Sequence, residues 1–131
     1  TIGTRTAVID AHSRVLLVRH SYVAGWLLPG GGVERGESIY AAAARELREE
    51  AAIVAEEDPH LFGVYLNDRQ FRGDHVACFV VRRFQQETFQ PNNEILEARF
   101  FAHDRLPDDA SPGTRRRIEE ILFERPIAHH W

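Results

Sequence analysis

The chain has 131 residues, of which 44% are apolar and 27% charged, the size and balance of one ordinary domain. The formal net charge of −4, from 16 basic and 20 acidic residues, lacks the basic excess typical of duplex-DNA binding. Every basic residue is Arg, which excludes chemistry that needs a phosphate-binding or Schiff-base lysine. We therefore expect residues 1–131 to form a single domain.

Neither a membrane span nor a metal-binding cysteine pattern is present. No run approaches 18 apolar residues, and no signal region opens the chain, so the sequence favours a cytoplasmic protein without membrane contact. The one cysteine, Cys78, lies in the apolar run 76–81 and is predicted to be a buried, unreactive thiol. The seven histidines lack the spacing of a zinc site.

The first half of the chain predicts two strands, a long loop and a helix. Residues 4–10 and 14–20 are rich in β-branched and aliphatic side chains, and the short segment 11–13 between them predicts an antiparallel pair. Five glycines and a proline make 25–37 a shaped loop. Strong helix formers then predict a helix over 39–52, which Ser38 can cap.

The second half predicts further strands over 61–67, 75–84 and 97–102. Ser111 as cap and Pro112 at the first helical position predict a last helix, which Pro126 ends. The triplet 115–117, all Arg, could bind phosphate or RNA, but glutamates follow at once and a solvated helix face is favoured. Three aromatic side chains are assigned to the core rather than to base stacking: Tyr22, Trp26 and Tyr65.

Three carboxylates on the first helix carry the chemical signal. Glu46, Glu49 and Glu50 are spaced three and four residues apart, share one helix face and repel one another. A divalent cation would neutralise them, and oxygen ligands favour Mg²⁺ or Mn²⁺. The alternative is a solvated face with ion pairs to Arg45 and Arg48, but the glycine loop before the helix favours a phosphate-binding site.

Residues 31–53 resemble the signature box of the Nudix hydrolases, GX5EX7REUXEEXGU, in which U is a bulky aliphatic residue. Eight of the nine specified positions match, and the departure is Ala52 in place of Gly, at a helix end where a left-handed residue often lies. The resemblance extends to the lead-in 26–31 and to the segment 94–101, and so points to a small, MutT-like member. It implies an α/β/α sandwich with a mixed β-sheet between helices.

The resemblance also implies roles for individual residues. Glu46, Glu49 and Glu50 would ligate Mg²⁺ or Mn²⁺, with help from a backbone carbonyl near Gly30, and one of them could act as the base. Glu37 would pair with Arg45 and lie near the metal. A further acid before the last strand often joins the metal or the base role. Glu94 is the candidate for that acid, with Glu97 as its alternative. The candidates for substrate contact are Arg19, His20 and Gly31, although for His20 a surface position is favoured.

The family reaction is attack by water on a nucleoside diphosphate linked to a moiety X. A small chain without insertions resembles the members that act on nucleoside triphosphates and those of broad specificity, so nucleoside triphosphates or related nucleotide derivatives are the favoured substrates. The alternatives are a Nudix-fold module that binds a nucleotide without hydrolysing it, and a hydrolase of a non-nucleotide diphosphate or of a capped RNA end. A homodimer is common in the family.

Overall fold

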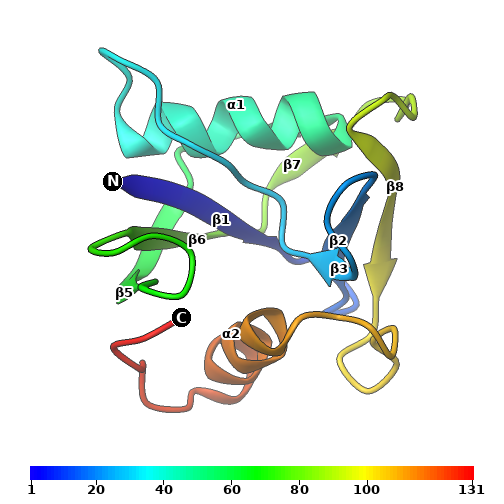
Figure 1. Cartoon of the computed structure of the whole chain (residues 1–131). Coiled ribbons are helices and arrows are strands. Elements are labelled where there is room, and N and C mark those ends of the chain that lie inside the picture. The colour runs from blue at the N-terminus through cyan, green and yellow to red at the C-terminus, as the bar shows by residue number, and fades with distance from the viewer.

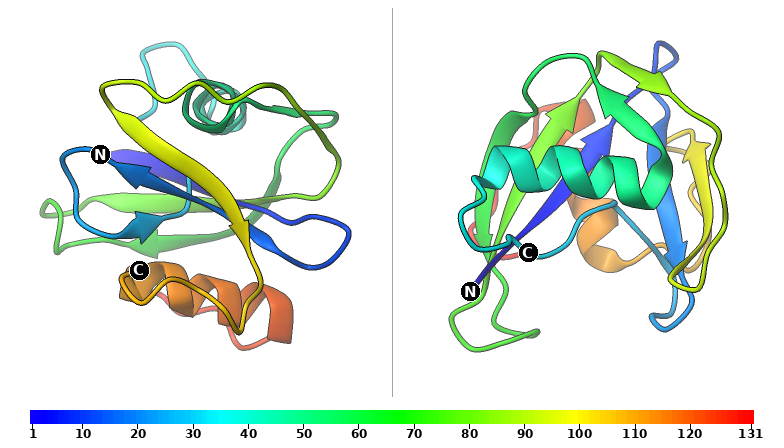
Figure 2. Two further views of the ribbon diagram at one scale, coloured as in Figure 1. Left: turned by 90° about the vertical axis from the view of Figure 1, so that its right-hand side faces the viewer. Right: turned by 90° about the horizontal axis from the view of Figure 1, so that it is seen from above.

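The computed structural model describes all of residues 1–131. Two helices, α1 (Ile39–Ala51) and α2 (Pro112–Phe123), lie on opposite sides of the strands, as Figures 1 and 2 show. The layers therefore follow the predicted order of helix, mixed sheet and helix. No helix is both long and apolar enough to cross a bilayer.

The mixed sheet contains β1 (Ile2–Val8), β6 (His75–Val81) and β5 (His60–Leu66) in the order β1-β6-β5. β1 runs parallel to β6, whereas β5 is antiparallel to it. Cys78, at the centre of β6, is fully buried, and burial raises the pKa of its thiol to about 12. The prediction of a buried thiol is thus confirmed.

A second, antiparallel sheet has the order β3-β2-β8, from β3 (Trp26–Leu27), β2 (Val15–His20) and β8 (Ile95–Phe101). Two short strands that the sequence did not predict, β4 (Ile53–Ala55) and β7 (Phe84–Gln86), pair with each other next to the end of α1. Only the first residue of β7, Phe84, lies in the predicted strand 75–84, because the chain leaves β6 after Val81 and turns at two exposed arginines.

The predicted antiparallel pair 4–10 and 14–20 is wrong. β1 and β2 belong to different sheets, and the single bridge Ile9–Val15 joins them at the turn. Both edges of β1 are already occupied, since β6 lies along one and the glycine loop along the other. The amide of Thr4 donates to the Gly31 carbonyl at 2.8 Å, and the amide of Thr6 donates to the Pro29 carbonyl at 2.8 Å. The loop thereby replaces the expected hairpin partner.

Helix α1 begins at its predicted cap and ends one residue before the predicted boundary. The Ser38 hydroxyl oxygen accepts a hydrogen bond from the Ala41 amide at 3.0 Å. Ala52 has φ 56° and ψ 34°, in the left-handed region. The chain therefore keeps a conformation that favours glycine, at the one box position where glycine is replaced.

The interpretation of 115–117 as a solvated face is wrong for Arg117, which is completely buried. Its guanidinium lies 4.2 Å from the centre of the Tyr65 ring and 4.9 Å from that of Trp131, and its Nε donates to Glu120 at 3.0 Å. The C-terminal tail covers it, because the Leu66 amide donates to the His129 carbonyl at 2.7 Å. A long-range contact of the tail thus buries the middle of an apparently solvated helix.

Candidate metal centre

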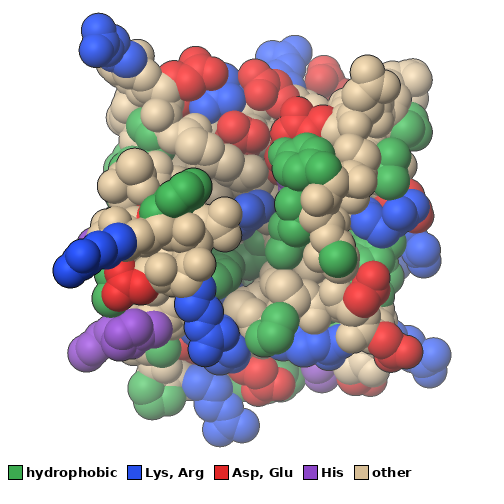
Figure 3. Space-filling model, in the orientation of Figure 1, with side chains coloured by type: hydrophobic (Ala, Val, Ile, Leu, Met, Phe, Trp, Pro, Cys, Tyr) green, Lys and Arg blue, Asp and Glu red, His purple; other side chains and the backbone are tan.

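The three helix carboxylates differ sharply in exposure. The side chain of Glu50 is 4% exposed and that of Glu46 is 14% exposed, whereas that of Glu49 is 59% exposed. The three predicted ligands therefore do not share one environment. Figure 3 shows acidic side chains gathered along α1, above a hollow in this face of the molecule.

The glycine loop packs directly on the buried acids. The Gly30 amide donates to Oε1 of Glu50 at 2.9 Å. A Cβ atom on Gly31 would lie 2.5 Å from Oε1 of Glu46, and one on Gly30 would collide with the Thr4 carbonyl. Close approach to β1 therefore requires glycine at position 30, whereas a side chain at position 31 would displace the Glu46 carboxylate.

Arg45 pins this loop to the helix through Glu37, the pair that the resemblance implies. Its Nε donates to Oε2 of Glu37 at 2.7 Å and its Nη2 to Oε1 at 3.0 Å, a two-bond contact that lowers the pKa of Glu37 to about 2. The same guanidinium donates to Glu46 at 3.0 Å and to Glu49 at 3.2 Å. Arg45 thus neutralises part of the acidic face, and its partners among the helix acids are Glu46 and Glu49 rather than Glu50.

The two acids near the last strand, Glu94 and Glu97, have different partners. Glu94 lies immediately before β8 and belongs to a group of donor atoms, with His20 and Glu50, that are all within 4.8 Å of one another. Glu97 instead pairs across the sheet with Arg19, whose Nη2 donates to it at 2.7 Å. The structure thus brings Glu94, rather than Glu97, to the helix acids, and it commits Arg19 to Glu97.

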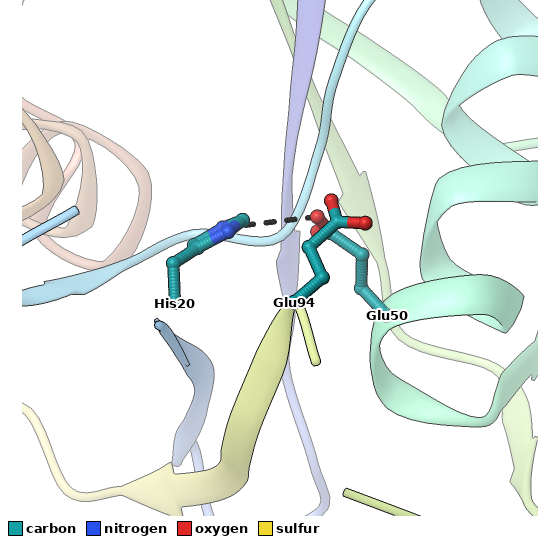
Figure 4. Close-up of side chains that lie close together, drawn as sticks. All are labelled: His20, Glu50 and Glu94. Atoms are coloured by element: carbon teal, nitrogen blue, oxygen red, sulfur yellow. Dashed lines mark ion pairs between the residues drawn. The ribbon is translucent and has the colours of Figure 1, made fainter. Parts of the chain in front are cut away.

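The favoured surface position of His20 is wrong. Its side chain is 6% exposed, and its Nε2 lies 3.7 Å from Oε2 of Glu50, the approach marked in Figure 4. Tyr22, assigned to the core, is 69% exposed and packs edge-on against the His20 ring at 5.4 Å, whereas Trp26 and Tyr65 are buried as expected. His20 is thus buried where a surface position was favoured, and Tyr22 is exposed where a core position was favoured.

Burial dominates the electrostatics of the site. It raises the pKa of Glu50 to about 7, although the Gly30 amide favours the charged form. Burial also raises the pKa of Glu46, against the opposing effect of Arg45. It lowers the pKa of His20, an effect that nearby Arg5 reinforces. The protein thus leaves the Glu50 charge poorly compensated.

Arg5 is the residue at this site that sequence reasoning missed. It lies on β1, where its Nη1 donates to the Leu28 carbonyl at 2.9 Å, and burial lowers its pKa while the charges of Glu50 and Glu46 raise it. A lone arginine between two threonines in a predicted strand was the available signal. Its effect is to hold the start of the glycine loop next to the acids.

The set of donors fits a hard divalent cation. Glu46, Glu50 and Glu94 offer carboxylate oxygens. Burial raises the pKa of both Glu46 and Glu50, but Glu46 accepts a bond from Arg45, whereas Glu50 has no such bond to supply a countercharge. A bound cation would supply that charge.

Residues 2–121 match the family model of the NUDIX domain. The chain belongs to the Nudix family. The ADP-ribose pyrophosphatase of Methanocaldococcus jannaschii is 29% identical over 104 residues, which are 76% of this chain and 61% of that protein. The chain thus spans less than two thirds of the length of that Nudix relative. The RNA pyrophosphohydrolase of Novosphingobium aromaticivorans is 28% identical over 118 residues, with 76% of this chain and 73% of that protein covered.

Solved Nudix structures share the fold. The crystal structure of a MutT NUDIX hydrolase from Burkholderia pseudomallei matches with a TM-score of 0.79 at 24% identity, over 92% of this chain and 97% of that one. The predicted MutT-like Nudix architecture is thereby confirmed.

Proposed function

We propose that this Nudix chain is a pyrophosphohydrolase that uses Mg²⁺ or Mn²⁺ to cleave the diphosphate linkage of a nucleoside diphosphate derivative. The observation that supports it best is the buried carboxylate of Glu50, which lies against the glycine loop beside Glu46 and Glu94. Buried acids whose charge the protein leaves poorly compensated are costly unless a cation joins them. A solvated helix face would not need such burial.

Each residue has a distinct role in this proposal. Glu46, Glu50 and the more exposed Glu49 hold the cation, together with the Gly30 carbonyl. A bound Mg²⁺ or Mn²⁺ lowers the pKa of water and neutralises phosphate oxygens. Glu94, the exposed acid beside Glu50, is our candidate either to join the cation or to accept the proton of the attacking water.

The loop contacts serve to position the diphosphate. The two-bond contact between Arg45 and Glu37 fixes one end of the loop, and the hydrogen bond from Arg5 to the Leu28 carbonyl fixes the other. Gly31 and Gly32 between them leave the backbone open to close approach by phosphate oxygens. We place Glu37 in this positioning role, because both of its carboxylate oxygens already accept bonds from Arg45.

The substrate class is tested by phosphate and pyrophosphate release with Mg²⁺ or Mn²⁺. The panel comprises nucleoside triphosphates, which we favour, ADP-ribose, nucleotide sugars, dinucleoside polyphosphates and 5′-triphosphorylated RNA. The relatives named for ADP-ribose and for RNA make those two substrates the principal alternatives. Metal-dependent turnover that is lost in Glu50→Gln supports the proposal. No turnover on the panel, together with tight nucleotide binding, would replace it with a sensor.

A further inference from the structure

His20 is a buried polar side chain without a partner. Its side chain is 6% exposed, and neither ring nitrogen has a hydrogen-bond partner. Buried polar groups are nearly always bonded, so an orphaned imidazole requires an explanation such as an ion or a water. The 3.7 Å between its Nε2 and Glu50 is too long for a hydrogen bond.

The backbone directs this imidazole toward the acids. The pairing of β2 with β8 changes register between Arg19 and His20, and such irregularities re-aim side chains next to functional sites. As Figure 4 shows, His20 reaches from the end of β2 toward Glu50 on α1 and Glu94 before β8. The end of β2, helix α1 and the segment before β8, which are distant in sequence, thus bring their donor atoms close together.

The donor atoms are spaced for a cation rather than for direct bonds. One atom from each residue can be chosen so that all lie within 4.8 Å of one another. Ligands held at about 2.1 Å around an octahedral ion are separated by roughly 3 to 4 Å, so a small inward shift is enough. Oε1 of Glu50 is occupied by the Gly30 amide, while Oε2 is the oxygen nearest His20.

We propose that His20 provides a nitrogen ligand to a divalent cation shared with Glu50 and Glu94, and that this nitrogen selects transition-metal ions such as Mn²⁺ over Mg²⁺. Both Mg²⁺ and Mn²⁺ take oxygen ligands, but Mn²⁺, as a first-row transition-metal ion, accepts an imidazole nitrogen more readily than Mg²⁺ does, and imidazole suits the later transition metals better still. The inference rests on the proposed function in its use of Glu50, but cation binding is measured without substrate or turnover.

The first test detects the nitrogen itself. Electron spin-echo spectroscopy of Mn²⁺ bound to the wild-type chain without substrate should show ¹⁴N modulation from a directly ligated imidazole. The modulation should disappear in His20→Gln, which offers an amide oxygen, and persist in His60→Gln, a control at an exposed histidine of β5. Bound Mn²⁺ without ¹⁴N modulation in the wild type would overturn the proposal.

The second test measures selectivity by titrating Mn²⁺ against Mg²⁺. His20→Gln should weaken Mn²⁺ binding by roughly tenfold or more and change Mg²⁺ binding much less. An equal loss for both ions would show that His20 only positions the carboxylates, and no loss would show that it is not a ligand. Turnover with no nitrogen signal refutes this inference alone. A nitrogen signal with no turnover refutes the proposed hydrolysis alone.

Discussion

Burial of Glu50 should destabilise the metal-free protein by an amount that depends on pH. The folded-state pKa is about 7, against an ordinary value of 4.5. At about 1.4 kcal/mol for each tenfold change in proton affinity, this difference corresponds to roughly 3 kcal/mol. The folded carboxyl binds its proton more tightly than the unfolded one. The free energy of unfolding therefore falls as pH rises from about 4.5 to about 7, and stays lower above that range.

Glu50→Gln removes this penalty while keeping an oxygen that can accept the Gly30 bond. In a chelator at pH 8, its melting temperature should exceed that of the wild type by on the order of 10 °C, and the difference should vanish near pH 4.5. Differential scanning calorimetry across this range measures both. Glu49→Gln is the matched control, because its side chain is 59% exposed and should change stability by less than about 1 kcal/mol.

Two results would refute this reasoning. One is a Glu50→Gln variant no more stable than the wild type at pH 8. The other is a stability difference that is the same at pH 4.5 and pH 8, since packing rather than ionisation would then explain it. Activity separates the two roles of the site, because both Gln variants should lower metal-dependent hydrolysis by at least about a hundredfold.

Three further predictions concern the end of α1, the contact between Arg45 and Glu37, and the buried Arg117. Ala52→Gly should raise the free energy of unfolding in urea by about 1 kcal/mol, because Ala52 is left-handed, whereas Ala44→Gly within α1 should lower it by a similar amount; a loss of stability in Ala52→Gly would contradict the strain argument. Arg45→Lys keeps the charge but not the two-bond fork, and should lower kcat/KM by about 10- to 100-fold in steady-state kinetics, whereas full activity would show that fork geometry is dispensable. Arg117→Met leaves Glu120 buried and unpaired, and should cost about 3–5 kcal/mol in urea unfolding. Adding Glu120→Gln should recover part of that loss, and an additive double variant would argue against the pair.

Local patterns made α1 and its acids predictable. The Ser38 cap, the helix formers and the offset between Glu37 and Arg45 all act within one or two helical turns, and all are present in the structure. Strand partners were not predictable in this way. The neighbours of β1 are β6, some seventy residues later, and the glycine loop. The carbonyls of that loop accept hydrogen bonds from β1 amides, which a hydrophobicity pattern does not reveal.

The buried polar residues were the main errors, and they share one cause. Charged and polar side chains are mostly exposed, so composition alone places Arg117 and His20 at the surface. Arg117 is buried by the C-terminal tail, and His20 by elements that converge from α1 and β8. Only the tertiary arrangement brings these covering segments over the two side chains. A lone charged residue inside a predicted strand, as with Arg5, is the local hint worth following.

Stability and cation binding are linked at this site, because the same carboxylate serves both. The fold places Glu50 where its charge is poorly compensated, which lowers the stability of the metal-free protein above neutral pH. A cation that binds only the folded state returns stability in proportion to the logarithm of its concentration over its Kd. The wild type should therefore gain more from added Mn²⁺ than Glu50→Gln does. The variant that is most stable without metal is then the one least able to use it.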